Sequence, residues 1–200
     1  MNQIFVISDI FGRTPALERL VQDLTVPGTC ADILDPYKGT DQGFASEAHA
    51  YDAFMSRTGL ESYREIVKEQ LGSVKEPACL IGFSVGATAV WQISGDPAFK
   101  KKVVRAYCFY PSRIRHFPDI QPCFEIELIF PISEPAFDVN KMMALQAGKS
   151  NVTCRKEKGK HGFMNALSPH YDESMSKNNQ RDLAAKIEKE RLHIRKIGRL

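Results

Sequence analysis

The chain has 200 residues, 43% of them hydrophobic, and a formal net charge of +3. A chain of this length can bury one sizeable core, so we expect a single domain over residues 1–200. The small net charge, and the interleaving of basic with acidic residues, argue against nucleic acid as a partner.

No apolar run approaches the roughly 18 residues that a membrane span requires. Met1 is followed by a strand pattern and not by a secretory signal. The five cysteines lie far apart and form no CxxC pair, which favours reduced thiols over a zinc site or a disulfide framework. We therefore expect a cytoplasmic protein with no membrane partner, no metal and no other cofactor.

Short apolar runs alternate along the chain with segments of helical periodicity. The apolar runs predict strands at residues 4–8, 30–34, 78–83, 103–110, 125–130 and 151–154. Helical spacing predicts helices at residues 14–24, 47–56, 60–71, 86–94 and 138–147, and a long one from about Lys177 with Leu183, Ile187, Ile194 and Ile197 on one face. This alternation predicts an α/β fold: a doubly wound, mostly parallel sheet with helices on both faces.

In such sheets ligands bind beyond the carboxyl ends of the strands, so the loops that follow strands are where functional residues are expected. Nucleotide-binding sheets carry a GxGxxG or a GxxxxGK[ST] turn in such a loop. Neither pattern occurs in this chain, so we expect no nucleotide cofactor.

The third predicted strand runs into Gly82-Phe83-Ser84-Val85-Gly86 and then into a predicted helix. A serine on a sharp turn from strand to helix needs small residues two positions before and after it, because strand and helix approach closely there. Gly82 and Gly86 provide this clearance. The pattern therefore predicts that Ser84 is a nucleophile, against the plainer interpretation of a turn that happens to contain serine.

A serine nucleophile needs a histidine base, which in this architecture follows a later strand than the serine and comes after the acid. Of the five histidines, only His161, in KGKHGFMN directly after the last predicted strand, has this position. The other four precede the serine, follow the wrong strand, or lie in the terminal turn or helix: His49, His116, His170 and His193. We predict that His161 is the base.

The acid is expected in PISEPAFDV, which follows the fifth predicted strand and offers Glu134 and Asp138. Glu134 lies about four residues past the strand and precedes proline, so we favour it as the acid. Asp138 stays open as an alternative, although it can also serve as the N-cap of the helix that follows.

Negative charge develops on the carbonyl oxygen during acyl transfer, and backbone amides must stabilise it. One donor is expected from Val85, directly after the nucleophile, and the other from Ile10 or Phe11 in the loop after the first strand. The nearby Arg13 is a candidate for binding a substrate carboxylate, with an exposed structural role as the alternative.

Six segments together resemble the dienelactone hydrolase family of α/β-hydrolases over nearly the whole chain. They are FVISDIFG, ILDPYKG, GFSVGA, CFYPS, HGFMN and SPHYD. The resemblance implies an α/β-hydrolase fold, a nucleophile at Ser84, a base at His161 and an acid on the loop that contains Glu134. The chain leaves no room for a large lid domain.

The chain departs from that family in three respects. Ser84 replaces the cysteine nucleophile of the namesake enzymes, so the dienelactone substrate is not carried over. Glu134 stands where the family usually has aspartate. The arginines that bind a substrate carboxylate in the family have no secure match, although Arg113 and Arg115 in YPSRIRH are candidates.

The expected activity is that of a serine hydrolase that cleaves a small carboxylic ester or lactone through an acyl-serine intermediate. Thioester or peptide cleavage by the same three residues is an alternative. A second alternative is a non-catalytic binding or regulatory protein on a hydrolase scaffold, since fold does not determine function. The sequence does not determine the oligomeric state.

Overall fold

The computed structural model describes the backbone of residues 1–197 and the side chains of residues 1–194. Six strands form one sheet in the order β2-β1-β3-β4-β5-β6, and every neighbouring pair runs parallel. The strands are β1 (Gln3–Ile7), β2 (Cys30–Leu34), β3 (Ala78–Phe83), β4 (Val103–Phe109), β5 (Glu125–Phe130) and β6 (Val152–Lys156). The predicted parallel α/β architecture is confirmed.

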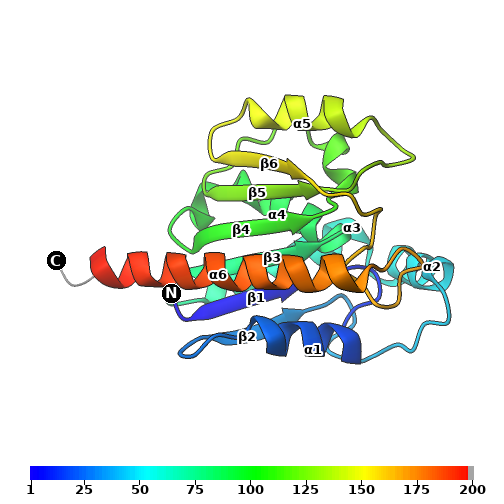
Figure 1. Ribbon diagram of the computed structural model, residues 1–200, viewed down its shortest axis with the longest axis horizontal. Helices are drawn as coiled ribbons and strands as arrows, with labels where there is room; N and C mark the ends of the chain where they lie inside the picture. The colour runs from blue at the N-terminus through cyan, green and yellow to red at the C-terminus, as the bar shows by residue number, and fades with distance from the viewer. Residues whose placement is uncertain (198–200) are drawn as a thin grey trace.

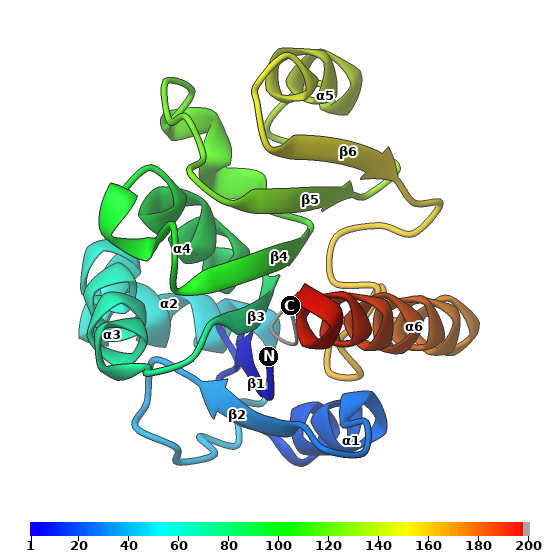
Figure 2. The same ribbon diagram turned by 90° about the vertical axis from the view of Figure 1, so that its left-hand side faces the viewer.

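Helices cover both faces of the sheet. Their bounds are α1 (Pro15–Leu24), α2 (Glu47–Arg57), α3 (Gly59–Ser73), α4 (Val85–Ser94), α5 (Val139–Ala147) and α6 (Glu173–Ile197), with short 3₁₀ helices η1 (Pro97–Phe99) and η2 (Ser112–His116). Helices α2, α3 and α4 lie on one side of the sheet and α1 and α6 on the other, while α5 packs beside β6 at the edge (Figures 1 and 2). Among the described residues, no helix has the length and apolarity needed to cross a bilayer.

Several element ends differ from the prediction by one to four residues, and two of these differences have a clear cause. Helix α6 begins at Glu173 and not near Lys177, because Asp172 caps it by accepting a hydrogen bond from the backbone amide of Met175 at 2.9 Å. Strand β4 ends at Phe109, and the next residue, Tyr110, turns the chain with a φ of 40°. The side chain of Ile197 lies outside the described residues.

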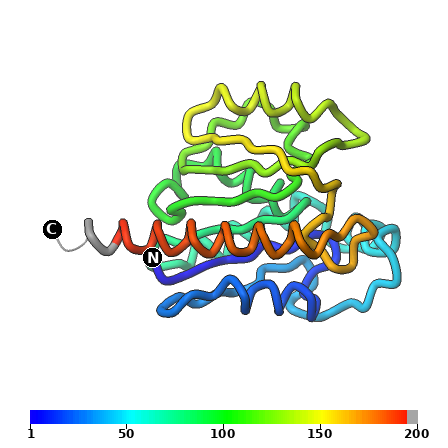
Figure 3. Tube along the Cα trace, viewed as in Figure 1, coloured from blue at the N-terminus to red at the C-terminus, as the bar shows by residue number. Residues whose placement is uncertain are grey.

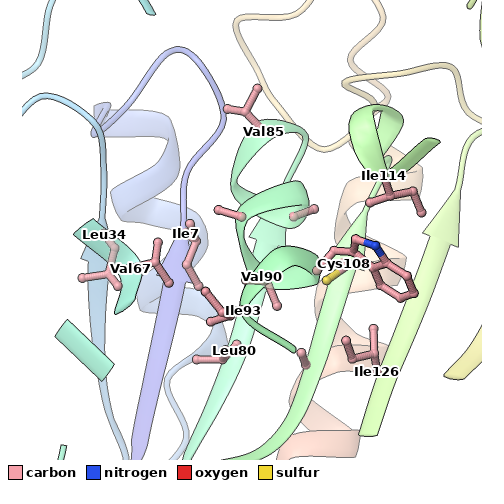
Figure 4. Packing of buried hydrophobic residues seen from close by; sticks show 14 of the residues in the cluster. Ile7, Leu34, Val67, Leu80, Val85, Val90, Ile93, Cys108, Ile114 and Ile126 are labelled. Atoms are coloured by element: carbon pink, nitrogen blue, oxygen red, sulfur yellow. The ribbon is translucent and has the colours of Figure 1, made fainter. Parts of the chain in front are cut away.

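The sheet separates two apolar clusters. On one side Leu80 and Ile126 pack against Val90 of α4, as Figure 4 shows. On the other side Ile81 of β3 packs with Leu183 of α6 in the second cluster. All six residues of β3 are buried, as expected for a central strand of a parallel sheet with both faces covered.

The strand order places the functional loops next to each other. From β1 the chain crosses to β2 on one side and then returns to β3 on the other, so the connections leave β1 and β3 in opposite directions. Such a reversal opens a crevice beyond the carboxyl ends of the two strands. The N-terminus and the described end of α6 both lie near the amino ends of the strands, away from this crevice (Figure 3).

Candidate active site

Ser84 lies between β3 and α4 in a backbone conformation that side chains rarely adopt, with a φ of 51° and a ψ of −109°. A Cβ atom on Gly82 would lie 2.8 Å from the backbone nitrogen of Ala87, and one on Gly86 would lie 2.5 Å from the carbonyl oxygen of Ile7. Glycine at position 82 thus allows β3 to approach α4, and glycine at position 86 allows α4 to approach the end of β1. This geometry is the sharp turn that the sequence predicts.

Three side chains that are far apart in the sequence form one chain of hydrogen bonds. The hydroxyl oxygen of Ser84 lies 3.0 Å from Nε2 of His161, and Nδ1 of the same ring lies 2.6 Å from Oε1 of Glu134. The His161 side chain is 25% exposed and that of Glu134 only 6% exposed. A buried carboxylate therefore holds a partly exposed imidazole toward the serine.

The alternative acid, Asp138, has a different place. Its carboxylate accepts hydrogen bonds from the backbone amides of Asn140 at 2.8 Å and Lys141 at 3.1 Å, and so caps the N-terminus of α5. Glu134 is the carboxylate that the structure places at His161.

The ring of Tyr110 packs against the imidazole of His161. Its ring centroid lies 4.9 Å from that of His161, and its side chain is 1% exposed. The amide of Tyr110 donates to the carbonyl of Ile129 in β5 at 2.7 Å, which fixes the turn after β4. His161 therefore rests on a buried ring whose backbone is tied to the sheet.

The amide of Val85 is the first of α4, where the unpaired N–H groups and the helix dipole favour negative charge. In the loop after β1, the amide of Phe11 donates to Oδ1 of Asp9 at 3.0 Å, and the hydroxyl of Tyr37 donates to the carbonyl of Ile10 at 2.7 Å. Because the Phe11 amide is engaged, the structure favours Ile10 as the second donor for an oxyanion.

The candidate substrate arginines make contacts within the protein. Arg13 pairs with Glu18 at 2.7 Å, and both side chains are more than 40% exposed. Arg113 donates to the hydroxyl of Tyr51 at 2.6 Å. Arg115 donates to a backbone carbonyl in its own 3₁₀ helix and lies over the Phe137 ring. Nothing in these contacts directs an arginine at Ser84.

A polar pair that sequence reasoning missed lies beside the site. The side-chain amide of Asn165 donates to Oδ2 of Asp9 at 2.6 Å and so links the loop after β1 to the loop that carries His161. Burial raises the pKa of Asp9, while the hydrogen bonds from Phe11 and Asn165 and the charge of His161 act in the opposite direction. Both residues lie inside quoted motifs, DIFG and HGFMN, but a pairing across 156 positions leaves no local pattern.

The remaining histidines lie elsewhere in the fold, His49 in α2, His116 in η2, His193 in α6 and His170 in the turn before α6. Within the described part of the chain, no group of three or more His, Cys, Asp or Glu side chains could hold a metal ion. All five cysteines are free thiols, and Cys79 and Cys108 are buried.

The sheet order, the elbow at Ser84 and the helices on both faces define an α/β-hydrolase fold. No family model matches the chain. Solved structures with this fold include a protein assigned as a dienelactone hydrolase from Klebsiella pneumoniae, 14% identical with a TM-score of 0.71, covering 92% of this chain and 85% of that one. A dienelactone hydrolase-like promiscuous phosphotriesterase from metagenomic libraries is 13% identical with a TM-score of 0.64, covering 94% and 86%.

Two further similarities differ in kind. The thioesterase domain from the curacin biosynthetic pathway shares the fold at 10% identity with a TM-score of 0.60, covering 92% of this chain and 90% of that domain. In sequence, the chain is 26% identical over 181 residues to YczH, an uncharacterized protein of Bacillus subtilis strain 168, covering 86% of this chain and 85% of YczH. The likeness to dienelactone hydrolase-like structures is therefore one of fold. The names of these neighbours refer to different reactions, those of a dienelactone hydrolase, a phosphotriesterase and a thioesterase.

Proposed function

We propose that the chain is a serine hydrolase that cleaves a small carboxylic ester or lactone through an acyl-serine intermediate. The observation that carries this proposal is the run of hydrogen bonds from Ser84 through His161 to Glu134, at 3.0 and 2.6 Å. A nucleophile in reach of a base, and a base oriented by a carboxylate, is the arrangement that activates a serine hydroxyl.

The reaction follows from the positions of the protons. With Nδ1 of His161 donating its proton to Glu134, Nε2 is free to accept the proton of Ser84 as the hydroxyl oxygen attacks the carbonyl carbon. The amides of Val85 and Ile10 then stabilise the oxyanion. His161 returns the proton to the leaving oxygen, and an acyl-serine forms.

Deacylation repeats these steps with water as the nucleophile. Nε2 of His161 takes a proton from the water, the hydroxide oxygen attacks the acyl carbon, and the proton passes to the oxygen of Ser84 as the carboxylic acid leaves. Glu134 stabilises the imidazolium that forms in both halves of the reaction.

A carboxylic ester and a thioester differ only in the leaving atom, which is oxygen in the first and sulfur in the second. The three side chains act on both in the same way. The buried carboxylate at 2.6 Å from His161 counts against a binding protein without chemistry, since such a protein has no need for an oriented base.

Labelling by a fluorophosphonate probe tests the proposal, because the probe reacts with activated serines. We expect labelling of the unaltered protein and none of Ser84→Ala, with turnover of p-nitrophenyl acetate reduced on the order of 10⁶-fold in that variant. The matched control is Ser94→Ala, since Ser94 lies in the same helix as the elbow and its hydroxyl donates only to the carbonyl of Trp91. Labelling that persists in Ser84→Ala would overturn the proposal.

A further inference from the structure

Two groups that the proposed reaction requires lie on separate loops. The Ile10 amide, the proposed second oxyanion donor, lies in the loop after β1, and His161 lies in the loop after β6. Both groups must meet the same transition state, one at the oxyanion and the other at the transferred proton, so the two loops must keep a fixed distance. A contact that joins the two loops directly would set that distance.

The loop after β1 is a tight turn built around the carboxylate of Asp9. The amide of Gly12 donates to the backbone carbonyl of Asp9 at 3.1 Å, and the amide of Phe11 donates to Oδ1 of the Asp9 side chain at 3.0 Å. Aspartate favours such turns because its side chain accepts from the backbone two residues further along. Ile10 is a central residue of this turn, so the position of its amide depends on the Asp9 carboxylate.

The loop after β6 is held in a similar way by Asn165. Its side-chain oxygen, Oδ1, accepts from the amide of Leu167 at 2.8 Å, and its backbone amide donates to the carbonyl of Gly162 at 2.9 Å. Gly162 directly follows His161, so Asn165 fixes the turn that begins at the base. Because a backbone N–H can only donate, the contact with Leu167 also identifies which end of the Asn165 side chain is the oxygen.

The other end of the Asn165 side chain joins the two loops. Its Nδ2 donates to Oδ2 of Asp9 at 2.6 Å, across 156 positions of the sequence. Among the described residues, this is the one side-chain hydrogen bond between the loop after β1 and the loop after β6. Tyr37, which follows β2, and Glu134, which follows β5, each hold one of the two loops and not the other.

We propose that Asp9 and Asn165 are a positioning pair, whose hydrogen bond sets the distance between the oxyanion donor at Ile10 and the base His161. The proposal rests on the proposed function and adds two residues to it. Neither side chain reacts with the substrate. Each acts through a backbone turn, Asp9 through the turn that carries the oxyanion donor and Asn165 through the turn that begins at the base.

The geometry allows the two residue types to be exchanged without the loss of a hydrogen bond. With asparagine at position 9, the side-chain oxygen can still accept from the Phe11 amide, and the side-chain nitrogen then faces position 165. With aspartate at position 165, one oxygen can still accept from the Leu167 amide, and the other can accept from position 9. Either substitution alone places two donors or two acceptors opposite each other.

The test is a cycle of Asp9→Asn, Asn165→Asp and the double variant that carries both. At about pH 8, well above the ordinary pKa of a carboxyl group, we expect each single variant to lower kcat for p-nitrophenyl acetate. The loss should be about 10- to 100-fold, since a small displacement of a catalytic group has effects of this size. KM should stay constant, because the positioned groups act in the transition state. The double variant should regain kcat to within about threefold of the unaltered protein.

Gln3→Glu is the matched control. The side-chain amide of Gln3 also donates to an aspartate, Asp32, at 2.7 Å. Gln3 is the first residue of β1, at the opposite end of that strand from Asp9. The substitution likewise sets two carboxylates opposite each other, and it should leave kcat unchanged.

Urea unfolding of the same variants separates positioning from a purely structural role. A double variant that regains stability but not kcat would make the pair structural and would overturn the proposal. An unchanged kcat in Asp9→Asn, or a change confined to KM, would overturn it as well. If a single variant does not fold, the double variant still decides, because the proposal requires it to fold and to turn over at close to the unaltered rate.

Hydrogen exchange of the Phe11 amide tests the contact without catalysis, because this amide is bound to the Asp9 carboxylate. We expect its protection to fall in Asp9→Asn and in Asn165→Asp, and to return in the double variant. This pattern in a protein whose Ser84 is not labelled by a fluorophosphonate would overturn the proposed function and leave the link between the loops. Labelling of Ser84 with no change in protection or kcat would overturn the positioning pair alone.

Discussion

Nδ1 of His161 and Oε1 of Glu134 lie 2.6 Å apart, and the glutamate side chain is buried whereas the imidazole is a quarter exposed. Asp138, four residues further along, caps α5. The two carboxylates of one loop therefore have separate tasks, one at the candidate base and one at a helix end. Their replacement should have separable consequences.

Glu134→Gln should lower kcat for p-nitrophenyl acetate by up to about 10⁴-fold, because the amide has no charge to stabilise the imidazolium and can hold the wrong tautomer of His161. Asp138→Ala should leave kcat unchanged and lower the free energy of unfolding by about 1 kcal/mol, the usual contribution of an N-cap. Steady-state kinetics and urea unfolding on both variants check this. A loss of activity in Asp138→Ala with none in Glu134→Gln would contradict the assignment.

The glycines of the elbow give a prediction about stability. A Cβ on Gly86 would press against the carbonyl oxygens of Ile7 and Ser8, which are backbone atoms and cannot move aside. We expect Gly86→Ala to lower the free energy of unfolding by about 3 kcal/mol, as overpacking does. Gly72→Ala is the control, since Gly72 lies in α3 with open space at its Cβ position and alanine favours helix. Urea unfolding should show Gly72→Ala at least as stable as the unaltered chain, and equal effects of the two substitutions would be inconsistent with a tight elbow.

The elbow and the position of His161 beside Ser84 were predictable because each has a local signature. Gly82 and Gly86 lie two positions before and after Ser84, and His161 follows the last strand, so chain order selects it. The acid was less certain, since two carboxylates share one loop and only their three-dimensional positions separate them. The six strands were predictable for a similar reason, because apolar runs of the buried sheet are short and continuous.

The contacts that hold the site together were not predictable. Asp9 meets Asn165, Tyr37 meets the Ile10 carbonyl, and Tyr110 lies under His161, each across a large separation in sequence. No periodicity or motif encodes such pairs, because they arise from how the loops pack after the sheet has formed. Arg13 shows the reverse. Its position in the sequence made it a candidate for binding a substrate carboxylate, but in the structure its guanidinium pairs with Glu18.

Tyr37 gives a prediction about the oxyanion donor. Its hydroxyl donates to the carbonyl of Ile10, so Tyr37→Phe should loosen the loop that carries the Ile10 amide. The loss of one hydrogen bond is worth about 1 kcal/mol, or about fivefold. Because an oxyanion donor acts in the transition state, kcat should fall about fivefold while KM stays constant.

The control for this variant is Tyr107→Phe, whose hydroxyl has no partner to lose. Kinetics on p-nitrophenyl acetate over a range of concentrations separate kcat from KM in both variants. A rise in KM with an unchanged kcat in Tyr37→Phe would assign the residue to substrate binding, and the positioning role would then be wrong.

Burial of Asp9 gives a prediction about pH. Its pKa is raised above the ordinary value of 3.8, mainly by burial, so the folded protein holds this proton at pH values where the unfolded chain has released it. When the folded state binds more protons, the free energy of unfolding falls as pH rises. The contribution of Asp9 to stability is therefore fully present below about pH 3.8 and is lost as the pH rises through the raised pKa.

Asp9→Asn removes the ionisation. We expect the free energy of unfolding of the unaltered protein, measured relative to this variant, to decline from about pH 4 upward, by about 1.4 kcal/mol for each unit by which the pKa is raised. Urea unfolding of both proteins at a series of pH values, at constant ionic strength, gives this difference directly. A difference that stays constant with pH would mean that Asp9 has the same proton affinity in the folded and unfolded chains, and a difference that grows with pH would mean that its hydrogen bonds from Phe11 and Asn165 outweigh burial.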